Sequence, residues 1–199
     1  MTIGSRKAVP ADDARVRVGP LMAIPAVVAE FGGDLQEMCR LVGLAPSVFS
    51  APDNPIPFVA GSRLIELCVQ ETGCEAFGFL VGQRVTPSAL GLPGFMLRAA
   101  PDVRTALELL IKHLSLHDEG GTVSLNSNGL TTAIAYTLIR PNNPVADQIY
   151  DLSIAAACNI MRALCGPRWT PIAVRLTRQR CPDWPAYKKF FSAPLELGT

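Results

Sequence analysis

The amino-acid sequence predicts an α+β domain in which N-terminal helices are followed by a small antiparallel sheet packed against helices. Three observations predict this class. Apolar residues recur at helical spacing through residues 20–86, two alternating segments flank the Asn-Gly pair at 128–129, and a long apolar seam follows at 143–164. A hairpin with helices before and after it in the chain is typical of a sheet that helices cover on one face.

The composition limits the classes of protein to consider. The chain has 199 residues, 49% of them hydrophobic, so it is long enough to bury its own core. The formal net charge is +1 and the Lys and Arg residues are scattered, which argues against a surface that neutralises DNA phosphates. The six cysteines form no Cys-x-x-Cys pair and no signal peptide is visible, so we expect a cytoplasmic protein. No apolar segment reaches the roughly 18 residues of a membrane span.

The first part of the domain is predicted to be helical. Residues 1–19 show no apolar periodicity and are expected to be a disordered tail. Residues 20–86 form the helical part, with one Pro-rich connecting loop at 45–58. The glycines between Gly73 and Gly82 are interpreted as helix punctuation. The four helices expected here cover residues 20–31, 34–42, 61–72 and 76–82.

The second part, residues 87–199, is predicted to be α+β. A loop with a short strand at 95–97 precedes a helix that Asp102 caps and that the glycines at 120–121 stop. The later elements are two hairpin strands at 122–126 and 130–139, a long helix at 143–164, a third strand at 172–177 and a last helix at 184–191.

Four strings of residues carry a family resemblance. They are Leu90-Gly-Leu-Pro-Gly-Phe95, Ala100-Pro-Asp-Val-Arg-Thr-Ala-Leu107, Cys165-Gly-Pro-Arg-Trp-Thr-Pro-Ile-Ala-Val-Arg175 and Tyr187-Lys-Lys-Phe-Phe-Ser-Ala-Pro194. In this order, with the hairpin between the second and third, they resemble the N-terminal arabinose-binding domain of AraC-type transcription regulators. The resemblance spans residues 20–199. It implies a domain that binds a small effector or pairs with another subunit, and so alters how a C-terminal double helix-turn-helix engages a promoter.

The resemblance also implies what lies outside the sequence. In the family, the stretch ending here at Thr199 continues with one more strand and then the DNA-binding helices. We therefore expect promoter DNA to be a partner only through a C-terminal domain that is absent from this chain. The effector itself is not identified by the resemblance, and no membrane partner is expected.

The only two histidines, His113 and His117, are spaced to share one helix face. Metal or haem ligation by this pair is conceivable, but no further Cys or His recurs at ligand spacing, so we expect no metal and no cofactor. Two other interpretations remain open. The histidines either form a polar edge of the helix, or one of them hydrogen-bonds an effector or senses pH.

A ligand pocket is expected between the sheet and the helix that carries the histidines, because ligand sites favour concave gaps between elements. Its predicted walls and anchors come from local pattern and not from a family motif. Arg98 is suited to hold a carboxylate bidentately, although a surface salt bridge is an equally good interpretation. The pocket residues predicted in this way are Phe95, Leu97, Arg98, His113, His117 and Tyr136.

The long helix is the predicted dimer face. Its seam includes Ile149, Ala156 and Ile160, and the small residues at 155–157 permit close approach of another helix. A homodimer would also explain the positive mean hydropathy of the chain. On this hypothesis, Ala156→Glu breaks the dimer.

Enzyme motifs are not found. The sequence has no Gly-x-Ser-x-Gly elbow, no phosphate-binding loop and no dinucleotide fingerprint, so we predict a protein that is not an enzyme. An effector-sensing and dimerisation domain is the first hypothesis, and a small apolar or amphipathic acid suits the composition better than a sugar. The alternative is a pure dimerisation scaffold, which a pocket without unfilled volume would favour.

Overall fold

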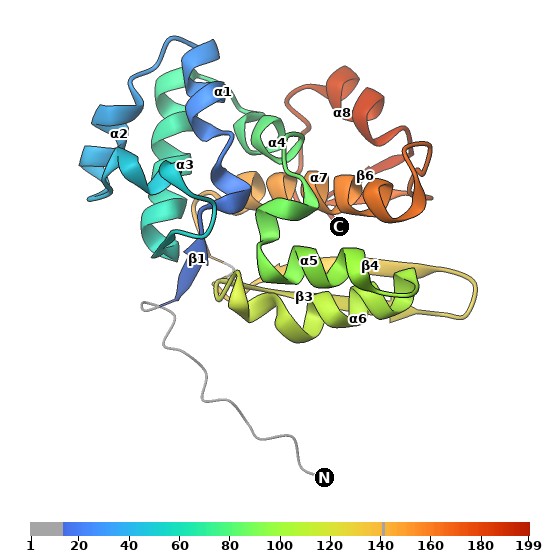
Figure 1. The fold of residues 1–199 in the computed structure, drawn as a ribbon. Coiled ribbons are helices and arrows are strands. Elements are labelled where there is room, and N and C mark those ends of the chain that lie inside the picture. The colour runs from blue at the N-terminus through green and yellow to red at the C-terminus, as the bar shows by residue number, and fades with distance from the viewer. Residues whose placement is uncertain (1–13, 141) are drawn as a thin grey trace.

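The computed structural model describes residues 14–140 and 142–199. The long helix α7 (Ala146–Cys165) crosses the middle of the molecule, as Figure 1 shows. The N-terminal helices and α8 (Trp184–Phe191) lie on one side of it, and the hairpin with α5 (Leu92–Ala99) and α6 (Val103–His113) lies on the other. Small sheets packed against helices confirm the α+β class.

The N-terminal helices follow the predicted order. They are α1 (Ile24–Glu30), α2 (Leu35–Leu41), α3 (Phe58–Thr72) and α4 (Phe77–Gly82). The Asp34 side chain caps α2 by accepting hydrogen bonds from two backbone amides of the first turn, at 2.9 and 3.2 Å. Helix α3 ends at Gly73, whose φ of +63° lies in the left-handed region that favours glycine.

Two expected irregular segments contain strands, so these predictions are wrong in part. Strand β1 (Arg15–Arg17) pairs antiparallel with β2 (Pro55–Pro57), inside the stretches expected to be a tail and a loop. A short 3₁₀ helix, η2 (Pro46–Ser50), also lies in that loop, and η1 (Gly19–Leu21) follows β1. Three residues are too few for a visible periodicity, and proline is tolerated in so short an edge strand. Residues 1–13 of the expected tail lie outside the described residues.

The segment expected to hold a short strand at 95–97 lies within helix α5, which corrects that prediction. The 3₁₀ helix η3 (Pro87–Leu90) precedes it, and Pro93 stands in its first turn, where a missing amide hydrogen does no harm. Helix α6 begins at the predicted cap, since the Asp102 carboxylate accepts a 2.8 Å hydrogen bond from the Thr105 amide. It ends at His113, where the 3₁₀ helix η4 (Leu114–Leu116) takes over.

The predicted hairpin is confirmed. Strands β3 (Gly121–Ser127) and β4 (Thr132–Leu138) pair antiparallel, with Val123 opposite Tyr136. Residues 128–131 connect them, and the Asn128 side chain accepts hydrogen bonds from two amides of this turn. The hairpin packs on α6 and on α7.

The predicted third strand does not join the hairpin. Strand β5 (Val174–Leu176) pairs with β6 (Leu195–Leu197), and this pair is parallel. Helix α8 connects them, and its residues match the predicted range. A buried network holds this region against α7, because the Tyr187 hydroxyl donates to Asp151 at 2.6 Å and Arg178 pairs with the same carboxylate at 2.7 Å. The Phe79 ring stacks on Tyr187 with 3.7 Å between centroids.

Two glycines of α4 are contact points with α7 and not helix punctuation. A Cβ on Gly78 would overlap the backbone of Gln148, and a Cβ on Gly82 would lie 2.5 Å from the Leu152 carbonyl oxygen. The same hypothetical Cβ of Gly82 would lie 2.9 Å from the Cβ of Ala155. The small residues of α7 were predicted to approach a helix of a second subunit, whereas the close contact that Ala155 makes is with α4 of the same chain.

Candidate functional site

A cavity of about 180 Å³ lies between α3, α6, the hairpin and α7. Segments around β1 and η1 complete its wall. Most of its lining is aliphatic or aromatic. The main apolar lining residues are Phe58 and Ile65 from α3, Leu107 and Leu110 from α6, Leu114 from η4, Val123 and Ile134 from the hairpin, and Ile149, Leu152 and Ile160 from α7.

Polar side chains enter the lining at few positions, namely Ser62, His117, Asp118, Tyr136 and Ser153. The centre of this set is a pair formed by Asp118 and Tyr136. The Tyr136 hydroxyl donates to Asp118 Oδ2 at 2.6 Å, and the Gly120 amide donates to Oδ1 at 2.7 Å. Burial raises the pKa of Asp118, against the lowering effect of these hydrogen bonds. Burial and the neighbouring Asp118 also raise the pKa of Tyr136.

His117 is buried in the wall with one ring nitrogen unpaired. Only 4% of the residue is exposed, and Nδ1 has no hydrogen-bond partner among the described residues. Burial, with a smaller contribution from the Arg17 charge, lowers the pKa of His117 to about 4. The imidazole is therefore neutral at neutral pH. Its backbone is fixed by β1, since the Arg17 amide donates to the His117 carbonyl oxygen at 2.9 Å.

Gly120 and Gly121 shape the polar end of the cavity. A Cβ on Gly120 would overlap the Phe58 ring, and one on Gly121 would overlap the Tyr136 ring. The pair was interpreted from the sequence as a helix stop, but helix α6 already ends at His113. The absence of side chains at 120–121 instead makes room for the two rings that line the cavity.

The structure brings only two of the six predicted pocket residues to the cavity, His117 and Tyr136. Phe95 is 65% exposed and Arg98 is also exposed. Leu97 is buried in a neighbouring apolar cluster under α5 and outside the cavity lining. These corrections share one cause, because a helix over 92–99 directs its side chains differently from the strand that was expected.

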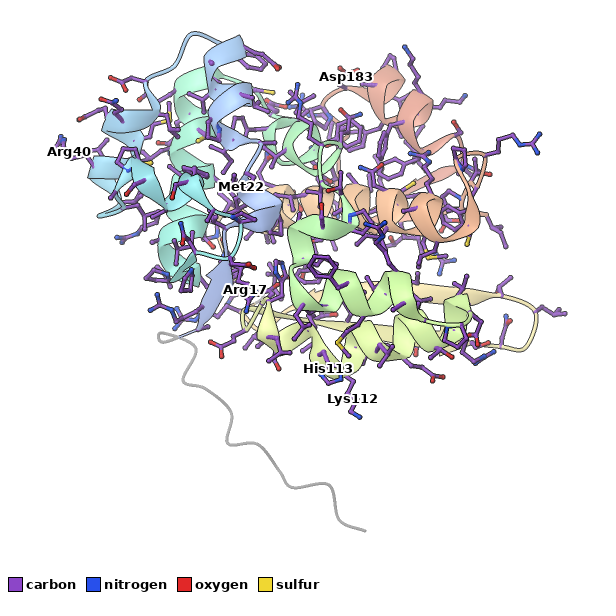
Figure 2. The ribbon with its side chains drawn as sticks, in the orientation of Figure 1. Arg17, Met22, Arg40, Lys112, His113 and Asp183 are labelled. Atoms are coloured by element: carbon purple, nitrogen blue, oxygen red, sulfur yellow. The ribbon has the colours of Figure 1, made fainter. Side chains whose placement is uncertain are left out.

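His113 is the fourth of these corrections. It is half-buried, does not line the cavity, and lies at the outer edge of α6 beside Lys112, as Figure 2 shows. The i, i+4 geometry expected of the two histidines is not formed. The helix ends at His113, and the tighter turn of η4 separates it from His117.

The predicted dimer face is an internal surface. Ile149, Ala156 and Ile160 are only 7%, 7% and 6% exposed, and all three line the cavity. The apolar seam on α7 was predicted to contact a second subunit. It lines the cavity and is buried within the chain, so these side chains are not available to a second subunit.

Asp118 is a polar lining residue that was not among the predicted site residues. Nothing in its local pattern distinguishes it from a solvated acid. Ser62 and Ser153 were missed too, because small hydroxyl residues on apolar helix faces have no functional signature of their own. Asn143 donates to Ser62 Oγ at 3.1 Å. The long-range contact between Asp118 and Tyr136 is set by the fold.

A second, outer hollow of about 260 Å³ adjoins the cavity wall. Gly19, Thr86 and Ser88 contribute to it. Pro20 and Val85 line both this hollow and the inner cavity. These two side chains therefore form a partition between the inner cavity and the outer hollow.

No group of three or more His, Cys, Asp or Glu within the described residues is arranged to hold a metal ion. No helix over the same residues is long and apolar enough to cross a membrane.

Comparisons with known proteins agree with the resemblance. HTH-type transcriptional regulator VirS of Mycobacterium tuberculosis, from strains CDC 1551 / Oshkosh and ATCC 25618 / H37Rv, is 24% identical over 155 residues, which are 77% of this chain and 46% of the relative. The crystal structure of transcriptional regulator CdpR from Pseudomonas aeruginosa has the same fold, with a TM-score of 0.55 and 20% identity over 83% of this chain and 51% of that one.

The chain thus spans about half the length of these transcription regulators. The family model described as the arabinose-binding domain of AraC transcription regulator, N-term, matches residues 32–199. This match covers most of the chain, including every element that lines the cavity except β1 and η1. The chain belongs to the family of N-terminal arabinose-binding domains of AraC transcription regulators.

Proposed function

We propose that this chain is the effector-sensing half of a transcription regulator and that the effector binds in the cavity beside α7. The cavity is the observation that carries the proposal. It combines about 180 Å³ of unfilled volume with a localised polar end built from Asp118, Tyr136 and His117. Ligand sites in proteins are commonly apolar hollows with a few placed polar groups. A pure scaffold has no need of such a cavity, because unfilled volume lowers stability.

The position of α7 supports a regulatory role for binding. One face of α7 lines the cavity, and another packs against α4 through Gly78 and Gly82. Its buried Asp151 holds Arg178 and Tyr187, which belong to the C-terminal elements of the chain. A ligand that prefers one placement of α7 would bias these contacts by its differential affinity. On this proposal, the bias reaches promoter DNA through a C-terminal helix-turn-helix domain.

The experiment is thermal unfolding of this chain with a panel of small metabolites, compared with a variant in which the cavity is filled. Ala156→Leu extends a buried side chain into the cavity, and Ala163→Leu is the matched control on an exposed position of the same helix. A ligand at about a hundred times its Kd adds roughly 2.7 kcal/mol to the free energy of unfolding. We expect a saturable shift that Ala156→Leu abolishes and Ala163→Leu preserves. No shift with any compound would favour the scaffold.

Self-association is the second part of the proposed function, and its surface differs from the one expected. The cavity face of α7 is buried, whereas Leu92 and Phe95 on α5 are 53% and 65% exposed. Exposed large apolar side chains of this kind support a homodimer. Sedimentation of Phe95→Ser tests it, with Leu130→Ser as a control at an exposed leucine on the hairpin turn. Loss of a dimer in the first variant alone is the expected result.

A further inference from the structure

We propose that the cavity accepts a neutral molecule with a small apolar body and one hydroxyl group, which donates a hydrogen bond at the Asp118–His117 end. The proposal rests on the proposed function and adds the chemical class of the effector. It follows from four features: the charges that line the cavity, the hydrogen-bonding capacity of its polar end, the clustering of its polar groups and its size.

The charges of the lining argue against an anionic ligand. Among the described residues that line the cavity there is no Lys and no Arg, and the one acidic side chain is Asp118. The neutral imidazole of His117 supplies no positive charge at neutral pH. A carboxylate ligand would lose its hydration without gaining a cation, and it would meet the Asp118 carboxyl group. The amphipathic acid favoured by the composition is therefore not supported, since Arg98 lies elsewhere.

A cationic ligand is also disfavoured. Asp118 already accepts hydrogen bonds from the Tyr136 hydroxyl and the Gly120 amide, at 2.6 and 2.7 Å. An ammonium group carries three donors and a large hydration energy, and the walls formed by Leu107, Leu110 and Ile160 offer no acceptors to the donors that do not reach Asp118. The remaining class is neutral.

The polar end offers both acceptors and a donor, which favours a hydroxyl over a carbonyl group. Each Asp118 oxygen accepts one hydrogen bond within the fold and can accept a second, and the neutral His117 ring, whose Nδ1 has no partner among the described residues, has one donor and one acceptor nitrogen. The Tyr136 hydroxyl hydrogen is engaged by Asp118, so Tyr136 offers an acceptor oxygen to the cavity. A ligand hydroxyl can donate to the acceptors and also accept from the imidazole, whereas a ketone or an ether can only accept.

The size and the distribution of polar groups exclude a sugar. An apolar cavity of roughly 150 Å³ is known to hold benzene, so about 180 Å³ suits a single ring or a short chain. Sugars need polar partners around their whole circumference. Here the walls formed by Leu107, Leu110 and Ile160 offer none.

The test uses four probes that share one body and differ in the polar group: benzyl alcohol, benzoate, benzylamine and toluene. Titration calorimetry of this chain at pH 7.5 measures the four affinities, and the series 1-hexanol, hexanoate, hexylamine and hexane repeats the comparison on a linear body. We expect the alcohol of at least one series to bind at least ten times more tightly than its carboxylate, amine and hydrocarbon counterparts. The order of the affinities is measured on the wild-type chain alone, so it tests the proposal even where a substitution disturbs folding.

Three variants then test which part of the cavity determines the ranking. Asp118→Asn replaces an acceptor oxygen of the carboxyl group with an amide donor and is expected to lower the alcohol affinity at least three-fold while raising the carboxylate affinity. Glu108→Gln makes the same change of side-chain type at an exposed position on α6 and is expected to change neither affinity. Ala156→Leu, which fills the cavity, is expected to abolish binding of every probe.

The outcomes separate this inference from the proposed function. Tighter binding of a carboxylate or an amine would overturn the neutral class while leaving a sensor cavity in place. Tightest binding of a hydrocarbon would overturn the role of the polar end. Absence of saturable binding in both series, or binding that survives Ala156→Leu, would overturn the cavity as the effector site and the proposed function with it.

Discussion

Gly82 of α4 lies so close to Leu152 of α7 that a Cβ on the glycine would be 2.5 Å from the leucine carbonyl oxygen. The backbones of the two helices are in contact there, with no side chain between them. Leu152 also lines the cavity. The same segment of α7 is therefore held on one side by α4 and meets the proposed effector on the other.

The first prediction concerns this contact. Gly82→Ala replaces a hydrogen with a methyl group that has no room, and backbone atoms cannot move aside as a flexible side chain can. We expect the substitution to lower the free energy of unfolding by about 1–3 kcal/mol, although alanine is the better helix former. Chemical denaturation measures it.

Gly61→Ala on α3 is the matched control. Its added Cβ would lie 3.3 Å from the end of the flexible Ile56 side chain. Helix propensity then dominates, and we expect stability unchanged or higher by up to about 1 kcal/mol. Equal losses in the two variants would contradict the special closeness of α4 and α7.

The second prediction distinguishes the cavity face of α7 from a dimer face. Ala156→Glu places a carboxyl group in an apolar wall that has no cation nearby, so we expect the free energy of unfolding to fall by at least about 2 kcal/mol. Ala163→Glu makes the same change on an exposed turn of α7 and is expected to leave stability nearly unchanged. A stable Ala156→Glu protein that only loses its dimer on sedimentation would restore the original hypothesis.

The third prediction is a pH dependence that belongs to His117. The pKa of this histidine is about 4 in the folded chain and about 6.5 for an unperturbed side chain, because burial disfavours the charged ring. Between these values the unfolded chain binds a proton that the folded chain does not. Acidification through this window therefore destabilises the fold, by up to about 3 kcal/mol for this group.

Other buried groups make the fold more stable on acidification. The contribution of His117 is therefore measured as a difference in stability between wild type and a variant. Burial raises the pKa of Asp118 and raises that of Asp151 to about 6, and each keeps its proton in the folded chain where it would lose it unfolded. Both proteins contain these carboxyl groups, so their contributions cancel when the free energy of unfolding of wild type is compared with that of His117→Gln from pH 7 to pH 4.5. The loss of stability on acidification should be smaller in His117→Gln than in wild type.

Local signals predicted the elements whose partners are near in the sequence. The hairpin of β3 and β4 and the range of α8 were both identified, since each depends on residues within one short segment. Strands β1 and β2 were not, because their support is distant. Arg15 donates to the Pro55 carbonyl and to the Glu119 carboxylate, residues 40 and 104 positions away.

In the site, too, local signals identified some residues, whereas others depend on partners distant in the sequence. His117 was predicted as a possible anchor on the helix and Tyr136 as a wall of the pocket, and both line the cavity. Asp118 gains its role from Tyr136, which lies 18 positions away on β4. The small residues of α7 indicated a close helix contact. The identity of the partner, α4, depended on the two glycines that were interpreted as punctuation.

The last prediction concerns access to the cavity. Val85 is 4% exposed and, with Pro20, separates the inner cavity from the outer hollow. Val85→Ala shortens this partition without changing the polar end. We expect association and dissociation of benzyl alcohol to accelerate together, at least three-fold, with the Kd changed by less than about three-fold, and NMR line-shape analysis measures both rates.

Val28→Ala, a buried valine outside the cavity lining, controls for a general loss of packing. Equal acceleration in both variants would mean that looser packing, and not this partition, governs access, whereas a rate change in Val85→Ala alone would place the passage between η1 and the segment that follows α4.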